Sequence, residues 1–533
     1  MKMNKLAMAV AASTAMMAGT AQALIPGAEG NGNERLDIYM SGATALDKQL
    51  KFYFTDLCQA GTLDIFTDNI SKPQGKAFSA YYCVLGPAEV SGLSKTYNVM
   101  LHKRSRGGSA WGVGPVAGAI EMEQMDITDA NCDFSTVDGT DNGNDVYECS
   151  SSNTFLARSD AGISDVEPQL FNYGPNLIDV NDDPSISAGD PGTVPVSDAL
   201  LANMDIAAMN ATTFGIVVTK DLRDALQDAQ GLTVGSEEVS EMPSLSRDLI
   251  GSILGGVRIS WDEVKVPGSA TGIFTNAAGT GYAATRSQIN VCRRVEGSGT
   301  QAQANAVFNN VGCGVALNPA TDNTPTSTLD GTGAGVDTPD QFGLGLFPLT
   351  AIHENSGSGD VTDCMSALQN YDDGAGNSVW GIGIQSLEKA DDDFRFIRIN
   401  GVAPVLESVA ANEYLDYVTT SIQWRTGSVD GIDAPAGDTL AVLQSIRTKA
   451  SNPTTIAALN SSLQSKSAIL DGGSKANIGA LALFYKGFAP SAPFDSANPV
   501  SCASREGVSG TLPPNSCNIP VVYRTECSGT ANK

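Results

Sequence analysis

The sequence has little histidine, few aromatic residues and few basic side chains. Of its 533 residues only His102 and His353 are histidine, and 6% are aromatic. Zinc sites built from several imidazoles and most histidine-dependent catalytic triads therefore lack the residues they need. The 32 basic residues stand against 59 acidic ones, a formal net charge of −27, which disfavours nucleic acid and anionic membrane surfaces as partners. We expect neither an enzyme nor a nucleic-acid-binding protein, and no metal or cofactor.

Long apolar runs are also missing, apart from a short one at the start of the chain. Two lysines precede an apolar stretch over residues 6–19, and Ala21-Gln22-Ala23 follows as a small-residue cleavage site. This order predicts a cleavable signal peptide over residues 1–23. The next residue is Leu24 rather than a cysteine that a lipid modifies. We therefore expect a periplasmic or secreted protein without a membrane anchor.

Ten cysteines are present, and all of them follow the predicted signal peptide. An even number of cysteines in an exported chain predicts disulfides, and their spacing matches neither a zinc knuckle nor a Cys-x-x-Cys redox pair. The sequence leaves the pairing open, with short closures such as Cys132 with Cys149 and Cys502 with Cys517 among the options. We expect structural cross-links, each stabilising the fold by about 2–4 kcal/mol.

A strand, a turn rich in Gly and Ser, and a helix follow one another repeatedly along the chain. The clearest strand patterns are Leu36–Met40, Tyr97–His102 and Ile289–Cys292. After the first of them, apolar residues recur at helical spacing between residues 46 and 57. This alternation predicts an α/β fold.

The turns after these three strands contain the groups that bind small oxyanions. They read Ser41-Gly42-Ala43-Thr44, Lys103-Arg104-Ser105-Arg106-Gly107-Gly108-Ser109 and Arg293-Arg294-Val295-Glu296-Gly297-Ser298-Gly299-Thr300. The first N–H groups of a helix are unpaired and partly positive, and glycine lets the backbone approach an anion closely. Hydroxyls add neutral donors, and arginine binds a phosphate or carboxylate with two hydrogen bonds. One such turn is typical of an ordinary helix start, but three together favour an oxyanion pocket.

These motifs, taken in order, resemble the periplasmic phosphate-binding proteins of ABC transporters, which have the type II periplasmic binding-protein fold. Arg294–Thr300 is similar to their Arg-x-Asp-Gly-Ser-Gly-Thr motif, with Glu296 in place of the Asp. Ser41–Thr44 resembles their Gly-Ala-Thr turn, and Ser105–Gly108 their Ser-Ser-Gly-Gly turn. Ser159–Asp165 is similar to their Ser-Asp-Ala stretch. Together with later matches, the resemblance spans residues 36 to about 425.

The resemblance implies a ligand shell with members from two lobes. Its expected members are Thr44, Ser105, Asp160, Arg294, Glu296, Ser298, Gly299 and Thr300. In the family, arginine and neutral donors hold the oxyanion, while the aspartate accepts the proton of a protonated phosphate and repels fully ionised sulfate. Asp160 is expected to be that acceptor.

The resemblance also implies two α/β lobes connected by two crossings of the chain. Lobe one is expected over residues 24–213 and 405–490, lobe two over 214–404, and a cysteine-containing extension over 491–533. The oxyanion would lie in the cleft between the lobes, which would close by a hinge motion.

Two functions from different classes follow. The first is a monomeric solute-binding protein that captures phosphate or a related tetrahedral oxyanion for uptake or scavenging, with an ABC transporter permease as partner. The alternative is a secreted structural or interaction protein on the same fold whose ligand binding is lost or altered. The insertion between Cys132 and Cys149 and the C-terminal extension favour the alternative. A phosphoester hydrolase would need a metal cluster or an activated nucleophile, which the sequence does not offer.

Overall fold

The computed structural model describes most of the chain between residues 31 and 464. The described residues are 26, 31–172, 176, 196–255, 260–265, 272–273, 285–308, 350–371, 378–389, 391–405, 408, 413–464, 469–471, 474–475 and 480–481. The predicted signal peptide, the extension over 491–533 and the Cys502–Cys517 option lie outside them. Among the helices of this described part, none is both long and apolar enough to cross a membrane.

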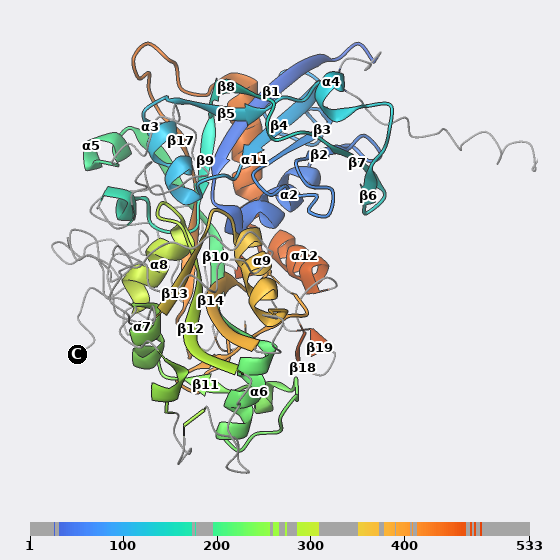
Figure 1. Cartoon of the computed structure of the whole chain (residues 1–533). Helices are drawn as coiled ribbons and strands as arrows, with labels where there is room; N and C mark the ends of the chain where they lie inside the picture. The colour runs from blue at the N-terminus through green and yellow to red at the C-terminus, as the bar shows by residue number, and fades with distance from the viewer. Residues whose placement is uncertain are drawn as a thin grey trace, which may run out of the picture.

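Strands from distant parts of the chain form one large mixed sheet (Figure 1). Its strands are β1 (Glu34–Gly42), β2 (Asp64–Thr67), β3 (Phe78–Leu85), β4 (Tyr97–Arg104), β6 (Gly139–Asp141), β7 (Asn144–Glu148), β9 (Ala161–Ser164), β10 (Met204–Thr219), β12 (Thr285–Arg294), β13 (Thr350–Asn355), β14 (Ser378–Ser386), β15 (Phe394–Phe396), β17 (Tyr417–Arg425) and β20 (Ala480–Leu481). They lie in the order β13-β12-β14-β10-β17-β9-β1-β4-β3-β2-β7-β6, and β15 and β20 also pair with β10.

Helices and three two-stranded sheets complete the described structure. The helices are α2 (Asp47–Thr55), α3 (Gly114–Ala117), α4 (Asp129–Cys132), α5 (Asp198–Leu201), α6 (Lys220–Ala229), α7 (Arg247–Leu254), α8 (Gly299–Phe308), α9 (Ser358–Gln369), α11 (Gly437–Ser451) and α12 (Pro453–Gln464), with 3₁₀ turns η1 (Thr44–Leu46), η2 (Ser109–Gly112), η3 (Pro168–Asn172), η5 (Val239–Glu241) and η6 (Trp261–Glu263). The small sheets pair β5 (Glu121–Met125) with β8 (Thr154–Arg158), β11 (Ser244–Leu245) with β16 (Arg398–Ile399), and β18 (Ile469–Asp471) with β19 (Ser474–Lys475).

The large sheet has two halves built to the same plan. In the first half β4, β1 and β9 run parallel, and β17 lies antiparallel beside β9. In the second half β13, β12 and β14 run parallel, and β10 lies antiparallel beside β14. In each half the three parallel strands lie side by side, with the first in chain order between the second and the third. An antiparallel strand from elsewhere in the chain lies next to the third. This arrangement confirms the predicted two-lobed α/β fold class.

Strand β10 connects the two halves and lies between them in Figure 1. Its residues 204–213 pair with β17, whereas residues 214–219 pair with β14 and partly with β15. The returning chain meets β10 at the same point, where the Tyr414 hydroxyl donates to the Phe214 carbonyl at 2.7 Å. The change of partners adjoins the expected first crossing, and the lobe boundaries themselves stay a prediction.

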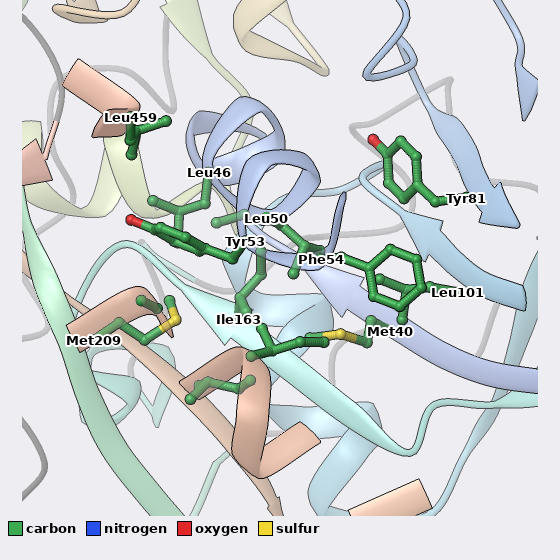
Figure 2. Packing of buried hydrophobic residues seen from close by; sticks show 14 of the residues in the cluster. Met40, Leu46, Leu50, Tyr53, Phe54, Tyr81, Leu101, Ile163, Met209 and Leu459 are labelled. Carbon is green, nitrogen blue, oxygen red and sulfur yellow. The ribbon is translucent and has the colours of Figure 1, made fainter. Parts of the chain in front are cut away.

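Helix α2 covers one face of the first half. Its residues Leu50, Tyr53 and Phe54 are at most 3% exposed, because spacings of three and four residues put them on one side of the helix. They pack in one cluster with Met40 of β1 and Ile163 of β9 (Figure 2). The helix predicted between residues 46 and 57 is confirmed. Burying each of these large side chains contributes about 1.5–3 kcal/mol, which fixes the end of β1 relative to the helix that follows it.

Disulfides link Cys58 with Cys83, Cys132 with Cys149, and Cys292 with Cys364 within the described residues. The Cys132–Cys149 closure, one of the options from the sequence, is confirmed, and it encloses the β6–β7 hairpin. The other two pairs were left open by the sequence. Cys58–Cys83 joins the end of α2 to β3, and Cys292–Cys364 joins β12 to α9.

Candidate functional site

Five strands, parallel to one another within each half, end where the two halves of the sheet meet. In the first half β1, β4 and β9 lead to Thr44, Ser109 and Asp165. In the second half β12 leads to Arg294–Thr300, and β13 leads to Ser358. Ligands of open α/β sheets bind outside the carboxyl ends of the strands, at a point where the strand order reverses. We refer to these residues as the junction cluster.

Arg294 bridges the two halves from inside the junction cluster. Its side chain is 2% exposed. Its Nη1 donates to Thr44 Oγ1 at 2.8 Å and to Ser358 Oγ at 3.2 Å. Its Nη2 donates to the Ser356 carbonyl at 2.5 Å, and its Nε to the Asn355 carbonyl at 3.1 Å. Because a guanidinium stays charged, its burial requires such a ring of oxygen acceptors.

Asp165 places a negative charge in the same cluster. Its carboxylate, 2% exposed, accepts hydrogen bonds from the Ser109 hydroxyl and, at 3.3 Å, from the Thr300 hydroxyl. Burial raises the pKa of the Asp165 carboxyl above its ordinary value, although the Ser109 hydrogen bond and the Arg294 charge act in the opposite direction. The cluster therefore contains a fixed cation and a carboxyl group whose proton affinity is increased.

Two glycines allow the turns of the two halves to approach each other. A Cβ on Gly299 would stand 1.6 Å from Asp165 Oδ1 and 2.7 Å from Ser109 Oγ. A Cβ on Gly108, which has a φ of +77°, would stand 2.9 Å from Ser298 Cα. Any side chain at either position would therefore push the halves apart at the junction cluster.

Ser298 offers a hydroxyl that the described protein does not use. The residue is 1% exposed, and its Oγ has no hydrogen-bond partner among the described residues. A buried hydroxyl left in this state costs about 1–3 kcal/mol. Glu296 lies two residues earlier, in the turn between β12 and α8, and is partly buried.

Ser105 lies beside a buried ion pair of the first half. Its Oγ donates to Asp47 Oδ1 at 2.7 Å and accepts from Lys103 Nζ at 2.9 Å. Lys103 also pairs with Asp47 at 3.1 Å and donates to the Gly42 carbonyl at 2.9 Å. Ser105 thus supports the first turn, whereas Ser109 of the same segment contacts Asp165.

Asp160 lies at the opposite end of β9 from the junction cluster, and the structure does not bring it together with the other predicted residues. It precedes β9, where its N–H donates to the Tyr39 carbonyl at 2.8 Å and its Oδ2 accepts from the Tyr39 N–H at 2.9 Å. At about 3.3 Å per strand residue, it lies roughly 16 Å from Asp165. The segment contains Ser-Asp twice, as Ser159-Asp160 and Ser164-Asp165. Only the second pair follows the carboxyl end of β9.

The sequence therefore gave no site role to three members of the cluster, Ser109, Asp165 and Ser358. The second Ser-Asp pair was the available signal for Asp165. Ser358 belongs to a Ser356-Gly357-Ser358 turn between β13 and α9. This turn is of the same type as the turns that were identified, because a strand precedes it and a helix follows it.

No protein-family model and no curated protein matches the chain. Among solved structures, it is similar to a putative phosphate ABC transporter substrate-binding protein with bound phosphate from Clostridium perfringens, at 11% identity over 80% of this chain and 98% of that chain, with a TM-score of 0.36. An ABC-type phosphate transport receptor from Vibrio cholerae matches at 11% identity over 80% and 98%, with a TM-score of 0.34. The ancestral soluble variant of the human phosphate binding protein matches at 13% identity over 84% and 91%, with a TM-score of 0.34. These structures belong to the family that the sequence motifs resemble, and at such values neither ligand nor partner is carried over from them.

Proposed function

We propose that the chain is an exported solute-binding protein that captures inorganic phosphate or a related tetrahedral oxyanion between its two lobes. The observation that supports this most directly is the buried guanidinium of Arg294, which contacts hydroxyls from both halves of the sheet. A guanidinium among neutral donors at helix starts suits an oxyanion, because it supplies charge and directional hydrogen bonds together.

We propose a ligand shell that keeps most of the predicted residues and changes the carboxylate. Its members are Thr44, Arg294, Ser298, Gly299 and Thr300, with Asp165 instead of Asp160 as the proton acceptor. Ser105 and Glu296 stay in the proposal as supporting residues of their turns. The increased proton affinity of the Asp165 carboxyl suits a group that accepts a hydrogen bond from a protonated phosphate oxygen.

The wider biological setting is part of the same proposal. We infer export from the predicted signal peptide over residues 1–23 and from the disulfides, which form in oxidising compartments. The predicted lobes, residues 24–213 with 405–490 and residues 214–404, would close on the oxyanion by a hinge motion. From the sequence resemblance we also propose an ABC transporter permease as partner, a monomeric state and the absence of catalysis.

The alternative function also has an observation in its favour. Every nitrogen of the Arg294 guanidinium donates to an oxygen of the protein itself. A junction that satisfies its own charge in this way suits a secreted structural or interaction protein that keeps the fold without the ligand.

Titration calorimetry on the purified chain with phosphate, arsenate and sulfate separates the two functions. For the solute-binding protein we expect heat with phosphate and arsenate, which are protonated near neutral pH, and at least about 100-fold weaker binding of sulfate. R294A should abolish the heat, because it removes the only charge-assisted fork of the proposed shell. Absence of heat with all three anions would favour the alternative.

A further inference from the structure

Ser358 lies at the start of α9, directly beside Thr44 Oγ1, which accepts a hydrogen bond from Arg294. Strand β13 runs parallel to β12, with Asn355 opposite Arg294, so the two strands end at the same level. Ser358 is 2% exposed and is the first residue of a 12-residue helix. None of the sequence motifs that predicted the oxyanion site includes the turn between β13 and α9.

Two N–H donors and one hydroxyl group converge on the hydroxyl oxygen of Thr44. Arg294 Nη1 donates to Thr44 Oγ1 at 2.8 Å, and the Ser358 backbone N–H donates to it at 3.3 Å. The Ser358 Oγ lies 2.9 Å from the same atom. A guanidinium, a helix-start amide and a hydroxyl thus surround one neutral oxygen. An anionic oxygen would be a much stronger acceptor for this set of donors than a threonine hydroxyl.

Ser358 is held firmly in this position by its neighbours. Gln385 Nε2 donates to its carbonyl at 2.9 Å. The Asp360 carboxylate accepts from the Gly357 N–H at 2.8 Å and so fixes the start of the helix. The buried Ser298 hydroxyl, which has no partner in the described structure, gives the same junction another unused donor. The second half therefore offers donors from two helix starts.

We propose that Ser358 binds the oxyanion directly, by giving its hydroxyl and its backbone N–H to the oxygen that Arg294 also binds. This inference rests on the proposed function and adds a ligand contact from the turn that follows β13. The ligand oxygen takes the place of Thr44 Oγ1 among these donors, and Thr44 then turns its hydroxyl to the ligand.

The test measures the affinity for inorganic phosphate by titration calorimetry in the full chain and in the variants S358A and S366A. Ser366 lies on the same helix, where its Oγ donates to Asp391 at 3.2 Å, so S366A is the matched control. We expect S358A to weaken phosphate binding about tenfold, the effect of losing one hydrogen bond to a charged group. S366A should bind within about twofold of the unaltered chain.

A second pair of variants separates binding from folding. S358T and S358V carry nearly the same branched side chain and differ in the hydroxyl. We expect S358T to bind phosphate about tenfold more tightly than S358V, and their melting temperatures without ligand measure separately what the loss of the Arg294–Ser358 hydrogen bond costs the fold. Equal phosphate affinities of S358T and S358V, or of S358A and the unaltered chain, would overturn the role of Ser358. If the unaltered chain binds none of phosphate, arsenate and sulfate, the proposed function itself fails.

Discussion

An aspartate follows a serine at each end of β9, yet Asp160 is half-buried and Asp165 is buried, and their surroundings differ completely. Asp160, before the strand, bonds to the backbone of Tyr39. Asp165, after the strand, accepts hydrogen bonds from hydroxyl groups of both halves of the sheet. Burial raises the pKa of both carboxyls. The difference shows that the end of the strand at which the residue lies, rather than the residue type, decides whether the carboxyl joins the junction cluster.

The largest effect is expected from exchanging the carboxyl for an amide at each end of β9. D165N should weaken phosphate binding about 100-fold, because an amide NH₂ faces the protonated oxygen, and should strengthen sulfate binding. D160N should change neither affinity by more than about twofold. Calorimetry with both anions on both variants gives the comparison. A large loss in D160N together with an unchanged D165N would reverse our assignment.

A methyl group next to Asp165 should have the next largest effect. G299A would place a Cβ 1.6 Å from Asp165 Oδ1, so the carboxylate must move away from Ser109 and Thr300. We expect phosphate affinity to fall about 30-fold, a value between those of a lost hydrogen bond and a lost carboxylate contact. G427A is the control, because no atom lies within 4 Å of a Cβ at that position. Equal phosphate affinities of the two variants would contradict the close approach at α8.

Removing the hydroxyl that supports Asp165 should have a smaller effect. S109A deletes the hydrogen bond from Ser109 to the carboxylate and should weaken phosphate binding about fivefold. S105A affects the Asp47–Lys103 pair of the same segment instead. We expect S105A to lower the melting temperature more than the affinity. The opposite ranking would show that Ser105, as the sequence resemblance implies, is the ligand contact.

The last effect concerns the pH dependence of stability, rather than phosphate affinity, and involves Asp160 at the other end of β9. Burial raises the pKa of Asp160 from 3.8 to about 6, so the folded state binds its proton more tightly than the unfolded state does. The stability from this group is complete below about pH 4 and is lost as the pH rises through 6. D160N should remove about 1–2 kcal/mol of this dependence. Urea unfolding from pH 4 to 7 measures this dependence. If the free energy of unfolding changes equally with pH in D160N and in the unaltered chain, Asp160 is not its source.

Much of the fold was predictable because it depends on local patterns. The apolar spacing between residues 46 and 57 corresponds to η1 and α2, and the strand at Ile289–Cys292 lies within β12. The short Cys132–Cys149 closure was among the options for the same reason. In contrast, the Cys292–Cys364 pair, 72 residues apart in sequence, depends on how β12 and α9 pack, which no local pattern records.

The site was predictable to the extent that its turns carry a recognisable motif. Arg294, Ser298, Gly299 and Thr300 come from one continuous segment, and the structure keeps them together. Asp165 was missed because a shift of five residues along β9 leaves the local Ser-Asp motif unchanged but moves the carboxyl to the opposite end of that strand. Ser358 was missed because its position depends on β13 lying beside β12.

The Cys292–Cys364 bond joins the strand that ends in Arg294 to the helix that begins with Ser358. In the solute-binding protein that we propose, this covalent tie would keep the two residues together when the predicted lobes separate. An arriving ion would then find half of its binding groups already assembled, and little conformational freedom would remain to be lost on capture. Chemical reduction should therefore loosen ligand retention even in protein that stays folded.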